Sequence, residues 1–210
     1  MSCVYLHTVT QWSDTLDLKS IITDANARRR MSRLVKMGVA TGLKCWDDAS
    51  LCASNTAIVT ATQYGCLSDS EKFLSQMITG QETNLSPTPF IQSTFNTIGA
   101  QIALIKACKE YNMTYVNRAN SLYDAYIDAY MLARDGKNVL LGYIDEVTPT
   151  LLNVVSRMRG IPTFDGAIFM VVSADKPSKA YIEMPEPDLQ KPLTNAEFLA
   201  LIGCNIPTSC

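Results

Sequence analysis

Two prolines, Pro87 and Pro89, stand at the start of a stretch that ends, near Leu104, in two helical turns with almost no polar residues. Proline is unfavourable inside a helix and biases the residue before it toward extended backbone. The stretch 89–104 is therefore expected to begin extended and to continue as an apolar helix, with Asn96 and Thr97 at the junction. An apolar helix entered in this way is typical of the buried centre of an α/β fold.

The start of this expected helix is a position where proteins can place a reactive group, because free backbone N–H groups and the helix dipole favour negative charge there. A nucleophile would be expected at Asn96, and an amide is not a nucleophile. The Asn96 side-chain oxygen can instead accept a backbone N–H and cap the helix. Placed in order with the motifs described below, the stretch resembles a nucleophile elbow kept for packing, without the chemistry.

Strand-forming segments alternate with helix-forming segments along the chain, which predicts an α/β fold. We expect a mixed five-stranded sheet flanked by helices around a buried central helix, with 180–184 pairing antiparallel with 166–173. Six segments are strand-forming, one more than the five strands of that sheet: residues 3–9, 55–62, 113–116, 139–144, 166–173 and 180–184. The expected helices run from Arg28 to about Trp46, from Ser68 to about Gly80, from the junction at Asn96, and over 121–134 and 196–202. Ser68 with Glu71, and Thr194 with Glu197, match capping boxes.

Length and charge restrict the function classes. The 210 residues suit one domain, or one large half of a two-part fold. The formal net charge of −2 gives no electrostatic case for nucleic-acid binding. No apolar run reaches the roughly 18–20 residues that span a bilayer. The N-terminus does not resemble a signal peptide, so we expect a cytoplasmic protein.

The seven cysteines include no C-x-x-C pair, and His7 is the single histidine. A zinc site is therefore not expected, and neither is another metal or a cofactor. Reduced thiols, some of them buried as small apolar residues, are the expected state of the cysteines.

Arginines gather at Arg28, Arg29, Arg30 and Arg33 in a chain that is otherwise sparsely charged. Such a run is more often a solvated helix start than a phosphate-binding patch. Both interpretations remain open on the sequence.

Five motifs in order give the chain a resemblance to β-ketoacyl synthases. They are residues 30–33 (Arg-Met-Ser-Arg), 60–65 (Thr-Ala-Thr-Gln-Tyr-Gly), 93–104, 139–142 (Val-Leu-Leu-Gly) and 165–167 (Asp-Gly-Ala). The chain resembles the N-terminal half of that family, of the thiolase fold, and in particular the short ketosynthase-like proteins of aryl-polyene and flexirubin-type pigment synthesis. The resemblance covers residues 1–185, and 186–210 is expected to be a Pro-rich tail with a short helix.

The resemblance implies a site without its nucleophile. The family pattern Thr-Ala-Cys-Ser-Ser-Gly falls on residues 94–99, which places the family's cysteine at Asn96, and the family's two catalytic histidines come from a C-terminal half that has no counterpart here. Decarboxylative condensation needs a thiolate and histidine donors. Cys66 and Cys108 are the conceivable replacement nucleophiles, although neither has neighbours that suggest a lowered pKa. His7 is expected to be structural or exposed.

Three functions follow from the resemblance. The first is a non-catalytic, chain-length-factor-like subunit that pairs with a ketosynthase or with itself, with Phe90, Ile91, Phe95 and Asn96 near the acyl tunnel or partner interface. In that reading, the four arginines would meet an acyl carrier protein.

The second function is half of a split β-ketoacyl synthase or acyltransferase that another chain completes. The third is a stand-alone acyl-binding module or a homodimer of half-folds. A lone half exposes the face that a second half would cover, so we expect either a dimer or the tail, residues 185–206, across that face.

Overall fold

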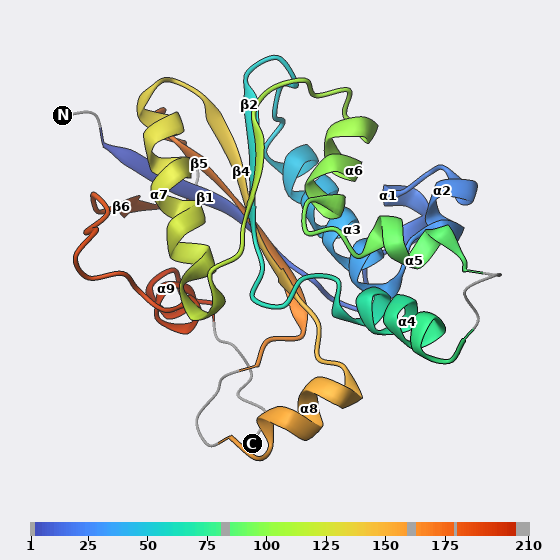
Figure 1. Ribbon diagram of the computed structural model, residues 1–210. Helices are drawn as coiled ribbons and strands as arrows, with labels where there is room; N and C mark the ends of the chain where they lie inside the picture. The colour runs from blue at the N-terminus through green and yellow to red at the C-terminus, as the bar shows by residue number, and fades with distance from the viewer. Residues whose placement is uncertain (1–2, 81–84, 159–162, 179, 205–210) are drawn as a thin grey trace.

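The computed structural model describes residues 3–80, 85–158, 163–178 and 180–204, and it is organised around one six-stranded sheet (Figure 1). The α/β class is confirmed, whereas the expected number of strands was one too low. The order across the sheet is β3-β2-β4-β5-β1-β6. The strands are β1 (Val4–Gln11), β2 (Thr56–Ala61), β3 (Asn112–Tyr115), β4 (Asn138–Asp145), β5 (Gly166–Ser173) and β6 (Tyr181–Met184).

The sheet is mixed because its two halves pair differently. β2 pairs in parallel with β3 and β4, whereas β5 pairs antiparallel with β4 and β1. β6 pairs antiparallel with β1, so the expected pairing of 180–184 with β5 was wrong. Both edges of β5 are already occupied, and every residue of β5 is buried. The next strand along the chain can therefore join only at the outer edge of β1.

Helices cover both faces of the sheet (Figure 1). On one face, α7 (Ser121–Arg134) and α9 (Asn195–Leu201) pack into a core with Tyr126 and Phe198 fully buried. On the other face, α3 (Arg33–Asp48) and α6 (Thr97–Ile105) pack over β2, β4 and β5. Both central strands β4 and β5 are thus covered on each side, which accounts for their continuous apolar sequences.

The buried helix on the second face is α3, not α6. Most of α3 is inaccessible to solvent, and its two glycines let α6 approach closely. A Cβ atom at Gly38 would meet Ile98, and one at Gly42 would meet Ile102 at 2.5 Å. By contrast, α6 is only partly buried, with Ile98 and Ile102 inside and Leu104 75 % exposed, so the buried central helix of the fold is α3 and not the helix expected within 89–104.

The arginine run does not open one continuous helix as expected. A short helix, α2 (Ala25–Arg30), ends before Met31, and α3 begins at Arg33. Asp24 caps α2 by accepting hydrogen bonds from the backbone N–H groups of Asn26 and Ala27. This side-chain cap gives the arginine-bearing segment a start of its own. A further short helix, α1 (Leu18–Ile21), precedes α2.

The approach to the elbow is also helical rather than extended. Pro87 and Pro89 lie in the first turn of α5 (Pro87–Gln92), where proline is tolerated because the first backbone N–H groups have no intrahelical partner anyway. The Gln92 side chain then fixes α5 to the turn between α2 and α3: its Oε1 accepts from Ser32 N at 2.7 Å and its Nε2 donates to Arg30 O. Residues 81–84 of the link before α5 lie outside the described residues.

Two more helices lie toward the outside of the fold, α4 (Leu67–Ile78) and α8 (Pro149–Val155). The capping box expected at the start of α4 is absent, because Ser68 N donates to Glu146 at 2.9 Å and Glu71 accepts from Thr148. The capping box of Thr194 with Glu197 at the start of α9 is present as expected. A single 3-10 turn, η2 (Arg118–Asn120), leads into α7.

The described part of the tail packs on the α7 face. Tyr126 donates to Pro185 O at 2.6 Å, and Asn195 accepts from Leu122 N and donates to the Tyr143 hydroxyl. The described part of the tail therefore lies on the opposite side of the sheet from α6.

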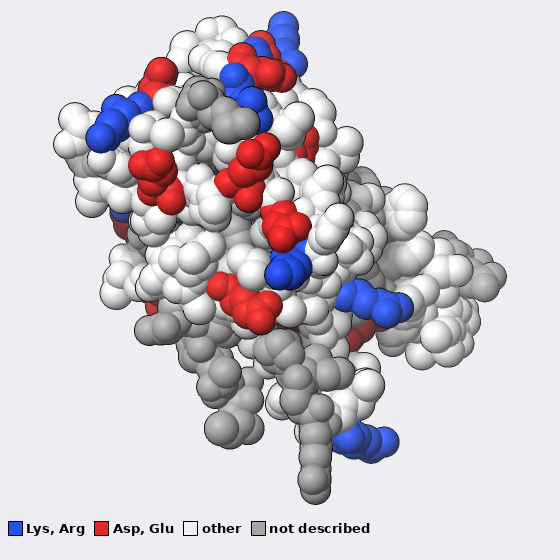
Figure 2. Space-filling model, turned by 90° about the vertical axis from the view of Figure 1, so that its left-hand side faces the viewer, with Lys and Arg blue, Asp and Glu red and all other residues white. Residues whose placement is uncertain are grey.

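Surface charge on the α7 side is mixed. Figure 2 views the left-hand side of Figure 1 and shows acidic and basic side chains interspersed on it. This visible face thus offers no continuous basic surface to a polyanion. Among the described residues, no helix is both long and apolar enough to cross a membrane.

Candidate functional site

The elbow of the fold lies where α6 begins, beside the C-terminal ends of β2 and β3. Thr114 Oγ1 donates to Asn96 Oδ1 at 3.0 Å and lies 2.7 Å from Thr60 Oγ1. Since the Thr114 proton is directed at Asn96, the Thr60 hydroxyl is the donor of the second bond. This chain of three polar side chains joins α6, β3 and β2.

Asn96 does not cap α6 in the expected way. It occupies the N-cap position, but its side chain makes no capping hydrogen bond and its backbone, at φ −84° and ψ 2°, is outside the extended region typical of caps. Its amide is instead directed at Thr114, and the residue is exposed. An exposed amide bound to a hydroxyl has no nucleophilic character, so this position cannot form a thioester.

Phe95 closes the elbow on the side of the loop after β2. Gly65 has a φ of +69°, and a Cβ atom there would lie 2.5 Å from the Phe95 ring. Next to these two residues is a cavity of only about 10 Å³, bounded also by Cys66, Ile98 and Thr114. That space holds about one water molecule and is far too small for an acyl chain.

Asp145 holds the loop after β2 in place through its carboxylate. The sequence analysis did not single this residue out. Its fully buried carboxylate accepts hydrogen bonds from Thr62 Oγ1, Gln63 N and Tyr64 N at 2.7–2.9 Å. Burial raises its pKa to about 6, against the lowering effect of these donors. The one sequence indication was its place directly after the apolar strand 139–144, at the strand ends where α/β folds collect functional groups.

Cys66 is brought close to the elbow but is not prepared for nucleophilic attack. Burial, followed by the negative charges of Asp69, Glu146 and Asp145, raises the pKa of its thiol to about 12. A thiol in this state is protonated at neutral pH, and thiols react as thiolates. Cys108 lies away from the elbow, and its buried thiol donates to Thr56 O.

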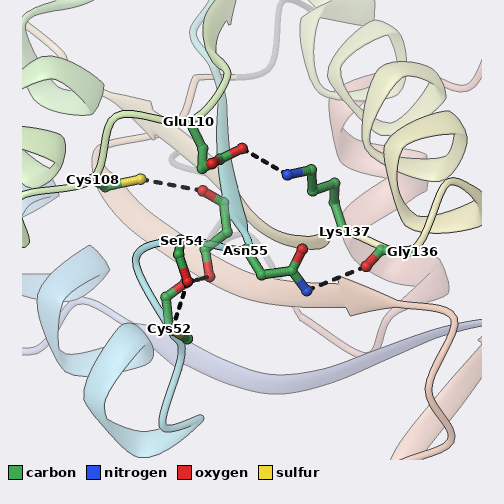
Figure 3. Close-up of polar contacts among 8 residues, drawn as sticks. Cys52, Ser54, Asn55, Cys108, Glu110, Gly136 and Lys137 are labelled. Carbon is green, nitrogen blue, oxygen red and sulfur yellow. Dashed lines mark hydrogen bonds and ion pairs between the residues drawn. The ribbon is translucent and has the colours of Figure 1, made fainter.

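The exposed Cys52 differs from these buried thiols. Figure 3 shows it beside Ser54, with its Sγ 3.2 Å from the Ser54 Oγ. Hydrogen bonds from the Ser54 side chain and backbone lower the pKa of Cys52. The same close-up shows the ion pair between Glu110 and Lys137, which lie just before the N-terminal ends of β3 and β4. Cys52 therefore lies before β2, whereas the elbow lies beyond the other end of that strand.

His7 is remote from the elbow. It lies in β1, three strands away from β2, and its Nδ1 is 2.7 Å from the Thr8 hydroxyl. Burial lowers its pKa, so the ring is neutral at neutral pH. It is half-buried and cannot assist chemistry at Asn96.

The four arginines do not form one patch. Arg33 makes a bidentate ion pair with Asp165 at 2.8–2.9 Å, Arg29 donates to Asn26, and Arg28 donates to the carbonyl of Ile22. Arg29 and Arg30 remain exposed at the end of α2.

The apolar residues expected near a tunnel or interface are exposed, though not continuous with a tunnel. Phe90 is 56 % exposed and packs its ring against Phe73 of α4, while Ile91 is 62 % and Phe95 51 % exposed. Each of these three large apolar side chains is thus left at least half exposed by the described residues.

The family model for the β-ketoacyl synthase N-terminal domain matches residues 9–197. No significant match was found among curated proteins. Among solved structures, a ketosynthase in complex with its chain length factor from Xenorhabdus doucetiae superposes with a TM-score of 0.65 at 17 % identity, over 81 % of this chain and 79 % of that one.

Two further structures superpose comparably. A type II polyketide synthase acyl-carrier protein in complex with its ketosynthase bound to the hexaketide gives a TM-score of 0.63 at 15 % identity, over 82 % of this chain. A β-ketoacyl synthase from Burkholderia phymatum gives 0.65 at 13 % identity, over 98 % of this chain. This chain spans 62 % of the length of each of these two chains, and identities this low establish a shared fold alone.

Proposed function

This chain belongs to the family of β-ketoacyl synthase N-terminal domains, and from that premise we propose that it acts as a non-catalytic, chain-length-factor-like subunit in polyketide- or fatty-acid-type synthesis of the aryl-polyene kind. Its partner is a ketosynthase that supplies the nucleophile and the histidines. The observation that carries the proposal is Asn96, an exposed amide bound to Thr114 at the position where the family places its cysteine.

The free edge of the sheet supports a protein partner. In the described part of the chain, β3 is the last strand on its side and pairs only with β2. Natural edge strands are commonly protected by charges or proline. β3 (Asn-Met-Thr-Tyr) has neither, and Met113 is exposed. A strand of another subunit can therefore extend the sheet here by backbone hydrogen bonding.

The small size of the elbow cavity favours an acyl site formed together with a partner subunit over one enclosed by this chain alone. A space of about 10 Å³ cannot hold an acyl chain. The exposed side chains of Phe90, Ile91 and Phe95 could instead form one wall of a tunnel whose other wall belongs to the partner. This argues against an acyl site enclosed by this chain at the elbow and for a subunit that shapes a site at an interface.

Carrier-protein contact is proposed for α2. Arg29 and Arg30 are exposed there, whereas Arg33 is already paired with Asp165. Two exposed guanidinium groups would raise the rate of encounter with an acidic carrier protein more than they would raise affinity.

The alternative of a split enzyme is less well supported. It needs a nucleophile in this chain at the elbow, where Cys66 is buried and its pKa is raised to about 12. Cys52, whose pKa is lowered, precedes the N-terminal end of β2, whereas the elbow lies beyond the C-terminal end of that strand. A catalytic cysteine in this chain would thus have to act far from the position that the family uses.

Co-expression with the ketosynthase of the same gene cluster tests the proposal. We expect a stable heterodimer by size-exclusion chromatography with light scattering, and a condensing activity that depends on both chains but survives alkylation of this one. A complete failure of the two chains to associate would contradict the proposal. Loss of activity when only this chain is alkylated would also contradict it, and would favour the split enzyme.

A further inference from the structure

Phe95 stands between the solvent and the small cavity at the elbow. Its ring lies against Gly65, where an added Cβ atom would be only 2.5 Å from the ring. The same side chain lines the cavity of about 10 Å³. The other residues that line this cavity are buried, except Thr114, whereas Phe95 is 51 % exposed. The Phe95 ring therefore covers the cavity from outside.

The side chains behind the ring are mainly apolar and belong to well-packed parts of the fold. Leu34 comes from α3, Ile98 from α6 and Ile144 from β4, and all three are part of the core on that side of the sheet. Cys66, directly before α4, also lines the cavity, and burial keeps its thiol protonated by raising its pKa. Because packed elements hold these side chains in place, removal of the ring would leave an open pocket rather than a collapsed one.

The hydroxyl groups of the lining are already engaged in hydrogen bonds within the chain. Thr60 and Thr114 bond to each other at 2.7 Å. Thr62 donates to Asp145 at 2.7 Å and accepts from the backbone N–H of Gly65. The space behind Phe95 is therefore better suited to an alkyl group than to water.

We propose that Phe95 determines how far an acyl chain extends at the elbow, because its ring plugs an apolar pocket that would otherwise lengthen the acyl site shared with the partner. This inference rests on the proposed function, since it names the residue of this chain that limits the length of the product. An acyl chain is a run of methylene groups, which apolar side chains such as those behind the ring bury favourably. With the ring in place, the remaining space of about 10 Å³ is too small for such a chain.

The neighbouring exposed side chains do not share this position. Phe90 packs its ring against Phe73 of α4, with the ring centroids 5.1 Å apart. Neither Phe90 nor Ile91 lines the cavity behind Phe95. Gly65 is part of the arrangement, since any side chain there would overlap the Phe95 ring. The plug is therefore one specific side chain and not a general property of the apolar surface.

The test compares the products of the complex with the ketosynthase of the same gene cluster, analysed by mass spectrometry. Phe95→Ala should shift the products toward chains longer by at least one extension unit, because the space that a phenyl ring vacates accommodates several methylene groups. Phe95→Leu should shift them in the same direction, and it keeps an apolar side chain at the surface in case Phe95→Ala unfolds. The control is Tyr181→Ala, which removes a ring that is 39 % exposed on β6, at the opposite edge of the sheet from β3, and should retain the wild-type product length.

Benzene tests the pocket in the isolated chain, without any partner. Dry apolar pockets bind small hydrocarbons, and a ligand that binds only the folded state raises its stability. Benzene near its solubility limit should therefore raise the unfolding midpoint of Phe95→Ala and leave the midpoints of the wild type and Tyr181→Ala unchanged.

The outcomes distinguish this inference from the proposed function. Wild-type product lengths from both Phe95→Ala and Phe95→Leu would overturn the plug while leaving the subunit proposal intact. Equal lengthening by Tyr181→Ala would show a general loosening of the complex and would also overturn it. The plug would fail as well if benzene stabilised the wild type as much as Phe95→Ala, because the ring would then not close the pocket. No association of the wild-type chain with the ketosynthase would overturn both proposals.

Discussion

Thr114 Oγ1 and Asn96 Oδ1 are joined by a hydrogen bond of 3.0 Å, and this contact connects the edge strand of the sheet to the first residue of the elbow. The amide of Asn96 thus has a structural role in place of a chemical one. This hydrogen bond also explains why α6 begins without a side-chain cap, since the Asn96 oxygen that would cap the helix is directed at β3.

Replacing Asn96 by Cys is expected to preserve the fold and to create no condensing enzyme. The lost hydrogen bond is at the surface, so the free energy of unfolding should fall by no more than about 1 kcal/mol. No histidine lies near the new thiol to assist decarboxylation. Urea denaturation measures the first expectation, and release of CO₂ from a malonyl-carrier substrate measures the second. Turnover by the isolated variant would refute the account of the elbow.

Asp145→Ala should destabilise the protein by at least about 2 kcal/mol, because it leaves the backbone N–H groups of Gln63 and Tyr64 buried without an acceptor. Asp165→Ala is the control. That carboxylate forms a partly exposed ion pair with Arg33, whose loss should cost under about 1 kcal/mol. Equal destabilisation of the two variants in chemical denaturation would show that Asp145 does not organise the loop.

The raised pKa of Asp145 also predicts a pH dependence of stability. The folded pKa is about 6 and the ordinary value is 3.8, so between these values the folded state binds more protons than the unfolded state. The free energy of unfolding contributed by this group therefore falls as pH rises from about 4 to 6 and is constant above. Glu146, whose pKa burial also raises, acts in the same direction. Unfolding curves at several pH values should show a shallower decline over this range in Asp145→Ala than in the wild type.

Gly65→Ala should destabilise the elbow for two separable reasons. The positive φ of 69° disfavours any L side chain, and the new methyl group would overlap the Phe95 ring. We expect a cost above about 1 kcal/mol in the single variant. Combining it with Phe95→Ala should remove the steric part, so the double variant should be more stable than the sum of the single effects predicts. Strict additivity in thermal denaturation would argue against this contact.

Alkylation of the native protein should discriminate among the cysteines. Cys52 is exposed and its pKa is lowered, whereas Cys45 and Cys66 are buried and their pKa values are raised to about 12. Iodoacetamide under native conditions should therefore modify Cys52 before the two buried thiols, as peptide mass spectrometry can show. Modification of Cys66 as rapidly as Cys52 would revive a nucleophile at the elbow and with it the split enzyme.

Local sequence patterns were sufficient for the elements that depend on local backbone preference and on burial. The segments 121–134 and 166–173 form a helix and a strand over those same residues, because a one-sided apolar repeat and a continuous apolar run each specify one backbone conformation. The Thr194 and Glu197 capping box formed for the same reason: both of its partners lie within four residues.

The tertiary structure alone decided the features that depend on competition between distant groups. Ser68 and Glu71 match a capping box as well as Thr194 and Glu197 do, yet α4 begins at Leu67, so Ser68 lies inside the helix. The Ser68 N–H donates to Glu146 and the Glu71 carboxylate accepts from Thr148. β6 joins β1 because both edges of β5 are occupied, and the buried acceptor role of Asp145 exists only because β2 and β4 end side by side. The residue type and its spacing determine which kinds of group a side chain can bind. The fold determines the actual partner, because it decides which donors, acceptors and strand edges lie within reach.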